Sequence, residues 1–276
     1  MSKMTQRHVY TSESVSEGHP DKVCDQLSDA VVDACLEQDS ESRIACESLV
    51  TSDLIVLSGE ITTKADVRWE QLARRVVNDI GYNSPDVGFC ADSCNVLLCI
   101  HPQSQDIAQG VTEGAGRYTD QGAGDQGMMF GYASDETAEL MPAPVLYAHR
   151  IVERLARLRH QDPETYAFLR PDAKSQVSFV YDQGQPVNVS TIVVSHQHTP
   201  DATERQLREL VEAVVQETIP SRFLTESIDY YINPTGRFVT GGPHGDTGVT
   251  GRKIIVDTYG GEAPHGGGAF SGKDPS

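Results

Sequence analysis

The sequence contains no long apolar run. None of its 276 residues lies in an uninterrupted hydrophobic stretch that approaches the roughly 18 residues needed for a membrane-spanning helix. The amino-terminal residues MSKMTQRHVY also lack the apolar core of an export signal. These two absences predict a soluble, cytoplasmic protein without a membrane partner.

Cysteine is absent from the chain after Cys99, and all six cysteines lie at or before that position. A secreted disulfide framework would distribute its cysteines along the chain, so this clustering argues against one. Cys90, Cys94 and Cys99 lack the paired C-x-x-C spacing of zinc sites. We therefore expect the cysteines to be free thiols that are buried as small hydrophobes.

Basic residues are scarce. The chain has 22 Lys and Arg against 40 Asp and Glu, a net charge of −18, which argues against a nucleic-acid partner because the phosphate backbone would be repelled. Residues 237–276 are an exception, since four basic and four acidic residues balance there. This stretch also holds 11 of the 24 glycines, which indicates either disorder or a backbone that approaches a ligand closely.

Two parts of the chain share the expected order helix, strand, strand, helix, strand. The first consists of 25–38, 44–50, 54–61, 67–80 and 87–100. The second consists of 144–159, 176–181, 187–195, 202–218 and 228–232. A strand over 254–259 and a helix start near Ser276 then predict a third unit that is incomplete.

Four segments combine glycine with charge: 18–22, 122–127, 170–174 and 241–274. In the first, a helix start beside His19 and Lys22 favours an anion, and Asp21 has the hard oxygen ligands of a divalent-cation site. Taken singly, each segment is equally compatible with a turn or a surface ion pair.

Residues 267–273 fit most of the phosphate-binding pattern G-x-x-x-x-G-K. Asp274 stands where a P-loop has Ser or Thr, which removes the hydroxyl expected on Mg²⁺. A P-loop-like nucleotide hydrolase therefore remains only an alternative.

Two carboxylates lie in apolar strand patterns, Glu47 and Glu60. A buried carboxylate is costly unless it is paired or bound to a cation. On the strand pattern alone, we expect both side chains to face solvent.

Several other polar residues are expected to be simply exposed. Asp25, Asp29 and Asp33 recur every four residues on the polar face of the first helix, which is typical of a solvated surface. His196 and His198 share one strand face, but without a third ligand we expect an exposed edge and not a metal site.

Taken together, the motifs resemble the S-adenosylmethionine synthetase family, also called methionine adenosyltransferases. The matching strings are Gly-His-Pro-Asp-Lys at 18–22, Gly-Ala-Gly-Asp-Gln-Gly at 122–127, Arg-Pro-Asp-Ala-Lys-Ser at 170–175, and the two long tail strings at 251–261 and 265–274. The resemblance extends from about Val9 to Ser276.

The resemblance implies an α+β fold with a pseudo-threefold repeat of similar α/β units, in which mixed sheets carry helices on one face. We expect an N-terminal unit over 7–105, a central unit over 119–236 and the truncated start of a C-terminal unit over 237–276. The family continues past Ser276 by roughly a domain. The family also implies a homodimer with active sites shared between subunits, and a dimer of dimers.

The implied reaction has two steps at one site. The methionine sulfur attacks the 5′ carbon of ATP and expels triphosphate, which is then hydrolysed to pyrophosphate and phosphate. Sulfur is already a good nucleophile, so the reaction depends on positioning and on stabilising a highly charged leaving group. The absence of the residues past Ser276 leads us to expect impaired activity, and a non-catalytic regulatory relative is a further alternative.

The resemblance assigns roles to individual residues. The catalytic groups are His19, Lys174, Arg252, Lys253 and Lys273. The ATP-binding residues include these five together with Asp172, Ala173, Arg237, Phe238, Asp246 and Ala269, with Phe238 as a face for adenine.

Further assignments concern methionine and the ions. The methionine-binding residues are Glu60, Gln103 and Asp246. Asp125 lines the site, and residues 103–113 correspond to a mobile loop over it. Two Mg²⁺ ions are expected at each site, one of them on Asp21, and a K⁺ ion on Glu47.

Overall fold

The computed structural model describes residues 7–114 and 117–276. These residues form two compact units that interleave along the chain. The α1 unit comprises residues 20–114, 117–129, 243–254 and 266–276, and the α4 unit comprises residues 7–19, 130–242 and 255–265. The predicted division into 7–105, 119–236 and 237–276 describes consecutive segments, and it stays a prediction.

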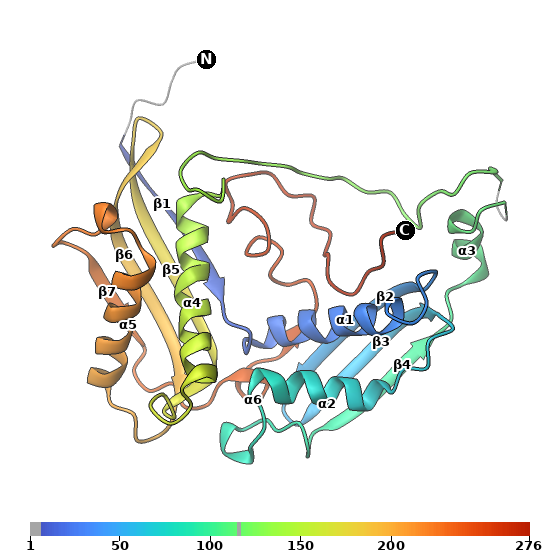
Figure 1. The fold of residues 1–276 in the computed structure, drawn as a ribbon, viewed down its shortest axis with the longest axis horizontal. Coiled ribbons are helices and arrows are strands. Elements are labelled where there is room, and N and C mark those ends of the chain that lie inside the picture. The colour runs from blue at the N-terminus through green and yellow to red at the C-terminus, as the bar shows by residue number, and fades with distance from the viewer. Residues whose placement is uncertain (1–6, 115–116) are drawn as a thin grey trace. The chain divides into compact units, whose positions relative to one another are not determined.

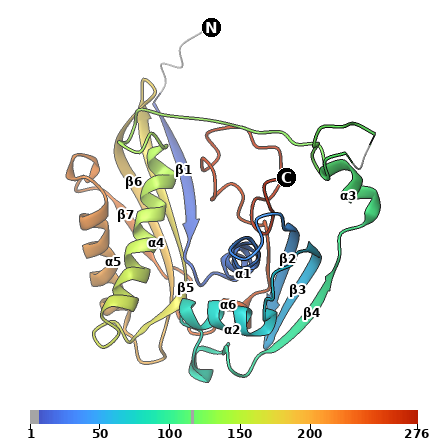
Figure 2. The same cartoon turned by 45° about the vertical axis from the view of Figure 1, so that its right-hand side comes forward.

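The α1 unit is a four-stranded mixed sheet with two helices on one face (Figures 1 and 2). Its main elements are α1 (Pro20–Leu36), β2 (Arg43–Thr51), β3 (Leu54–Thr62), α2 (Trp69–Ile80), β4 (Asn95–His101) and β8 (Gly248–Val249). The strand order is β4-β3-β2-β8, in which only β3 and β4 run parallel. Two short elements complete it, the 3₁₀ helix Pro85–Val87 and α3 (Gln105–Val111).

The α4 unit has the same layered construction. Its main elements are β1 (His8–Val15), α4 (Ala143–Gln161), β5 (Leu169–Asp182), β6 (Gln185–His198), α5 (Glu204–Thr218), the 3₁₀ helix Ser221–Phe223 and β7 (Asp229–Ile232). The strand order is β1-β5-β6-β7, and only β6 and β7 run parallel. A four-residue helix, α6 (Gly242–Gly245), follows in the chain.

The predicted repeat of element order is confirmed. In each unit a helix leads into an antiparallel pair, and a second helix returns the chain to a strand parallel to the second member of that pair. Each sheet is completed by an edge strand from elsewhere in the chain, β8 for the α1 unit and β1 for the α4 unit. The fold is therefore α+β with repeated units, and β1 was not anticipated.

The helix boundaries follow from local chemistry. Gly81 ends α2 in the left-handed conformation at φ 109°. Thr203 and Gln206 form a reciprocal capping box at the start of α5. The apolar faces of α1 and α2 bury Val31, Cys35 and Val77 against their sheet, which removes large apolar areas from water.

Parts of residues 237–276, which we call the tail, cover the free edge of β2. Gly248 and Val249 pair with Val50 and Leu49. Farther along β2, the Cys46 N–H donates to the Gly272 carbonyl at 2.8 Å, and the Ile44 N–H donates to Asp274 Oδ1 at 2.6 Å. Two separate tail pieces thus satisfy backbone groups that an edge strand would leave open.

Two predicted strands differ from the structure. The predicted strand over 254–259 is wrong, because this segment forms turns in which the N–H groups of Thr258 and Gly260 both donate to the Ile255 carbonyl. The β-branched residues Ile254, Ile255 and Val256 are typical of a strand, but only Val256 is buried. The predicted strand over 87–100 is confirmed only for its final part, β4.

The cysteines are free thiols, and five are buried as predicted, whereas Cys99 on β4 is exposed. Burial raises the pKa of the Cys46 thiol to about 12, so this sulfur stays protonated at neutral pH.

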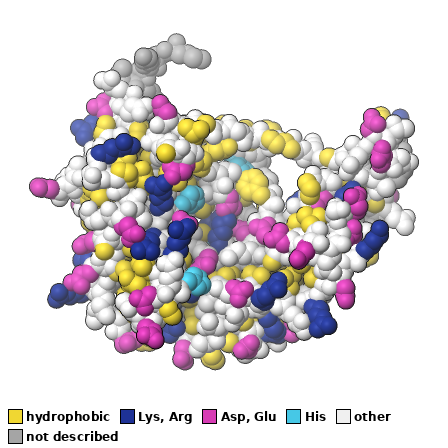
Figure 3. Space-filling model, viewed as in Figure 1, with side chains coloured by type: hydrophobic (Ala, Val, Ile, Leu, Met, Phe, Trp, Pro, Cys, Tyr) yellow, Lys and Arg dark blue, Asp and Glu magenta, His cyan; other side chains and the backbone are white. Residues whose placement is uncertain are grey.

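Surface charges on α4 and α5 are mixed in sign. Arg157 pairs with Glu153, and Arg205 pairs with Glu209 one helical turn away. Figure 3 shows the basic side chains over these helices interspersed with acidic ones. Within residues 7–114 and 117–276, no helix combines the length and apolarity needed to cross a membrane.

Replacement of Gly272 by Ala is expected to detach the tail from β2. Gly272 has φ +81°, and an added Cβ would lie 1.9 Å from the Cys46 carbonyl oxygen. Gly267 has φ +92° with nothing within 4 Å of an added Cβ, so Gly267→Ala is a matched control with the same left-handed strain of roughly 1–2 kcal/mol. We expect a larger drop in melting temperature for Gly272→Ala, with faster hydrogen exchange at the Cys46 amide. Equal effects of the two substitutions would contradict this docking.

Tail docking is also expected to depend on pH through Asp274. Burial alone would raise the pKa of this carboxyl, but hydrogen bonds from Ser276, the Ile44 amide and Lys273 lower it to about 2. A carboxylate with a pKa below its unfolded value of about 3.9 stabilises the fold above that value, and the contribution is lost as the pH falls through the folded pKa. We therefore expect protection of the Ile44 amide to fall between about pH 4 and pH 2. Hydrogen exchange, corrected for intrinsic rates and compared with β3 amides, measures it; constant protection would refute it.

Candidate active site

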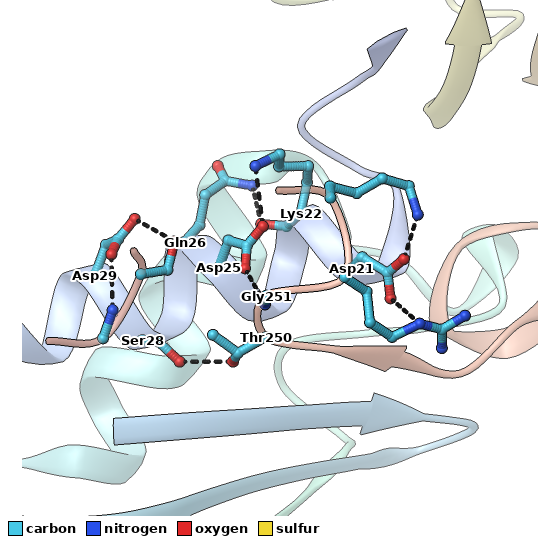
Figure 4. A network of polar contacts seen from close by, with 12 residues as sticks. Asp21, Lys22, Asp25, Gln26, Ser28, Asp29, Thr250 and Gly251 are labelled. Carbon is cyan, nitrogen blue, oxygen red and sulfur yellow. Dashed lines mark hydrogen bonds and ion pairs between the residues drawn. The ribbon is translucent and has the colours of Figure 1, made fainter. Parts of the chain in front are cut away.

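The first turn of α1 brings a predicted metal ligand against two predicted phosphate-binding cations. Asp21 is only 1% exposed, and Lys253 Nζ lies 2.5 Å from its Oδ2. Arg252 Nε lies 3.6 Å from Oδ1, which also accepts the Val249 N–H at 3.1 Å. Figure 4 shows this carboxylate between the two cationic side chains. Their charges compensate for the cost of burying an ionised carboxyl.

Two further aspartates of α1 also contact the tail. The prediction of a solvated side chain is wrong for Asp25, which is buried, whereas Asp29 is exposed as predicted. Asp25 is 3% exposed and accepts the Gly251 N–H at 2.9 Å. Asp29 accepts the Gly272 N–H at 3.0 Å (Figure 4). The helical pattern alone could not reveal this, because the partners lie more than 220 residues away in the chain. Asp33 is exposed, as predicted.

Lys273 and Ala269 belong to the same stretch of tail. Lys273 forms an isolated bridge with Ala45 of β2, and its Nζ lies 2.9 Å from Asp274 Oδ1. Ala269 packs near Gly251, where an added Cβ would come within 2.5 Å of the Ala269 Cβ. The predicted cations Arg252, Lys253 and Lys273 therefore project from tail segments that are fixed to α1 and β2.

These contacts do not form a P-loop. Such a loop connects a strand to a helix and leaves its N–H groups open to phosphate. The residues that lead into these glycines, 254–265, form turns and irregular structure and not a strand. The Gly272 N–H is bonded to Asp29 instead.

In the α4 unit, the His19 motif meets the motif that contains Asp172. Ser16 exchanges two hydrogen bonds of 2.8 Å with Ala173, one of them through its hydroxyl. Gly18 lies so near Pro171 that an added Cβ would be 2.3 Å away. His19 itself is 2% exposed. These two predicted ATP-binding segments are thus packed together, a juxtaposition that the motifs alone did not specify.

Other residues of the Asp172 motif have distinct environments. Asp172 is buried and accepts the Gly242 N–H at 2.9 Å. Lys174 is exposed on β5, opposite Val15 of β1. The motif therefore presents a cationic side chain to solvent beside an anchored carboxylate.

Arg237 and Phe238 are held at the end of β6. His198 donates its own N–H to the Phe238 carbonyl at 2.9 Å, and its ring Nε2 accepts the Phe238 N–H at 3.1 Å. His198 and Arg237 line a cavity of about 190 Å³. This geometry fixes the backbone of the predicted adenine-binding residue.

The expectation that His196 and His198 lie on an exposed edge is wrong, since both are buried. Burial lowers the pKa of His196 to about 4, so its ring is neutral at physiological pH. The strand pattern predicted that the two histidines share one strand face. It gave no signal of the hydrogen bonds that Asn233 and Phe238 make with their backbone N–H groups.

Glu60 and Gln103 lie at the same end of the α1-unit sheet. Glu60 on β3 is in register with His101 on parallel β4, and their side chains pair at 3.0 Å. The Gln103 N–H donates to Thr62 Oγ1 at 3.1 Å. The structure therefore brings Glu60, near the end of β3, close to the segment after β4 that contains Gln103.

The segment expected as a mobile loop over 103–113 contains a helix, α3, which starts after Ser104 and buries Val111. The polar composition gave no signal of this short helix, because Val111 is the one residue of α3 that is buried. Asp125 and Asp246 are exposed, and Asp125 Oδ1 accepts the Gln126 N–H at 2.7 Å. Over residues 7–114 and 117–276, no hydrogen bond or ion pair joins either aspartate to the other predicted ligands.

Glu47 is exposed on β2, as its strand pattern favoured. Partial burial, with a smaller contribution from the charge of Asp25, raises the pKa of Glu47. Residues 7–114 and 117–276 include no group of three or more His, Cys, Asp or Glu side chains arranged to hold a metal ion.

Comparison with known proteins gives matches in the same order as these segments. The N-terminal domain model of S-adenosylmethionine synthetase matches residues 7–105, the central domain model matches 120–238 and the C-terminal domain model matches 240–276.

Two curated relatives are similar along almost the whole chain. The S-adenosylmethionine synthase of Desulfosudis oleivorans is 55% identical over 274 residues, which cover 99% of this chain and 70% of the relative. That of Sorangium cellulosum is 54% identical over 271 residues, which cover 98% of this chain and 64% of the relative. With its three domain matches and its cationic tail bound to α1, the chain belongs to the S-adenosylmethionine synthetase family, whose members use metal ions.

Proposed function

We propose that this protein transfers the adenosyl group of ATP to the sulfur of L-methionine and then hydrolyses the triphosphate to pyrophosphate and phosphate. The observation that carries the proposal is the buried Asp21 held between Lys253 and Arg252. It occurs in a chain that matches the three domains of the family in order. Free thiols and these substrates indicate a cytoplasmic enzyme.

The cations Arg252 and Lys253 are proposed to bind the triphosphate. The Arg252 side chain is 54% exposed, whereas that of Lys253 is 17% exposed and rests on Asp21. Arg252 is thus accessible to an incoming phosphate, and Lys253 supplies charge from a fixed position. Fixed charge that meets a developing negative charge lowers the barrier without reorganisation.

The family resemblance supplies further ATP-binding assignments. His19 and Lys174 face the triphosphate, Asp172 and Ala173 contact the nucleotide, and Phe238 stacks on adenine beside Arg237. Support comes from the packing of Ser16 on Ala173 and from the two hydrogen bonds between His198 and Phe238.

Asp21 fits a Mg²⁺ ligand. Mg²⁺ takes one or two carboxylates plus substrate phosphates and water, and seldom an all-protein cage. A buried carboxylate with hard oxygens beside phosphate-binding cations matches that preference. Two ions are proposed for each site, and when bound they neutralise the charge that develops on the triphosphate.

Glu47 fits a K⁺ ligand. Its pKa is raised by burial and by the charge of Asp25, so two carboxylates repel each other there. A monovalent cation with oxygen ligands relieves that repulsion.

Methionine binds through its charged end. Glu60 accepts the ammonium group, the Gln103 amide meets the carboxylate, and Asp246 completes the contacts, while Asp125 lines the site. The shared sheet end of Glu60 and Gln103 supports this assignment.

The first step needs no base. The sulfur lone pair forms the bond to C5′ while the C5′–O bond breaks, and its electron pair leaves with the triphosphate. A sulfonium results. Water then attacks a phosphorus atom of the bound triphosphate, so the same cations serve both steps.

The enzyme is proposed to act as a homodimer with shared active sites, paired into a dimer of dimers. Leu97 and Leu98 on the edge strand β4 are 51% and 43% exposed. Consecutive strand residues point to opposite faces, so β4 presents apolar surface on both faces. A subunit interface would cover such surface.

Replacement of Lys174 by Ala tests the assignment. With ATP, Mg²⁺ and K⁺, we expect S-adenosylmethionine and phosphate to form only when methionine is present. Lys174→Ala should lower kcat by about 100-fold, as loss of one charge-stabilising donor typically does. The exposed Lys64 provides the control variant Lys64→Ala, which should keep full activity. Phosphate release without methionine, or unchanged turnover by Lys174→Ala, would contradict the proposal.

A further inference from the structure

Three aspartates of α1 form one stripe. Asp21, Asp25 and Asp29 are spaced by four residues, which places them on one helix face one turn apart. Each accepts a backbone N–H from the tail, at 3.1 Å from Val249, 2.9 Å from Gly251 and 3.0 Å from Gly272. Figure 4 shows the tail following this stripe.

The carboxylates of Asp25 and Asp29 both bond groups of the protein, Asp25 as a buried side chain and Asp29 as an exposed one. Asp25 is 3% exposed, and its second oxygen accepts Lys22 Nζ at 2.9 Å. Asp29 also accepts the Ser271 hydroxyl at 3.2 Å. Between them, Ser28 bonds Thr250 Oγ1 at 2.9 Å. A carboxylate that accepts a backbone N–H makes a charge-assisted bond, which is stronger than its neutral counterpart.

The two glycines whose N–H groups these aspartates accept directly precede the cations in the sequence. Gly251 lies before Arg252 and Lys253, and Gly272 lies before Lys273. Both glycines have left-handed backbones, with φ +76° and +81°. The direction of the next side chain depends on that turn, because the chain reverses at the glycine.

Resting on the proposed function, we propose that Asp25 and Asp29 are positioning residues that aim the triphosphate-binding cations. Asp25 fixes the turn that carries Arg252 and Lys253, and Asp29 fixes the turn that carries Lys273. Neither aspartate touches the substrate. Their effect reaches the triphosphate through the glycine N–H groups.

The test uses tripolyphosphate with Mg²⁺ as a probe of the cations alone, and methionine binding as a separate readout. Asp25→Ala and Asp29→Ala should each weaken tripolyphosphate binding by about 10-fold to 100-fold, the loss expected for one charged hydrogen bond. The affinity for methionine should change less than about threefold, since Glu60 lies on β3 and Gln103 follows β4, and neither belongs to α1 or the tail. The exposed Asp33, one turn further along, gives the control Asp33→Ala, which should bind both ligands as the unaltered protein does.

Conservative variants guard against simple loss of fold. Asp25→Asn and Asp29→Asn retain an oxygen acceptor for the glycine N–H and should recover most of the tripolyphosphate affinity, with circular dichroism reporting intact structure. Alanine variants that bind tripolyphosphate normally would overturn the positioning role alone. Parallel loss of methionine and tripolyphosphate binding in a folded variant would also overturn it, because the effect would then be general. Failure of the unaltered protein to bind tripolyphosphate would overturn the proposed function and this inference together.

Discussion

The attachment of the tail to α1 and β2 depends on hydrogen bonds between side-chain carboxylates and backbone N–H groups. The tail has almost no secondary structure of its own and few buried apolar side chains, so a hydrophobic core cannot hold it. Asp21, Asp25, Asp29 and Asp274 do so instead, three by accepting tail N–H groups and one by accepting an N–H of β2. These bonds are directional, which suits a segment whose cations must point one way.

This arrangement also explains the distribution of charge. The acidic excess lies before Arg237, and part of it lines α1. The tail brings its cations to that acidic helix and not to a basic surface. The negative charge of these carboxylates is compensated by N–H groups and by Lys253, while the Arg252 side chain is 54% exposed.

Much of the fold was predictable because its signals are local. The periodic apolar residues of α1, α2, α4 and α5 and the two hairpins gave the repeated order of elements. Strand β1 was not predictable in the same way, since its pairing with β5 joins residues far apart in the sequence. The run Ile254, Ile255 and Val256 was misleading, because strand propensity reflects packing that this segment does not find.

The same difference between local and long-range signals applies to the candidate site. Motif resemblance identified Asp21, Arg252 and Lys253, and the structure joins them directly. The motifs gave no indication that Asp25 accepts the N–H of a glycine 226 residues away. A carboxylate every fourth residue is usual on a solvated helix face, so only tertiary structure separates Asp25 from the exposed Asp33.

The edge strand β8 has a consequence for biosynthesis. Ser48 of β2 and its partner Thr250 are separated by 202 residues, so the ribosome exposes the β2 edge long before the segment that covers it. At about 5–20 residues per second, that interval is roughly 10–40 s. During this time the nascent α1 unit carries an open sheet edge that can pair with other chains.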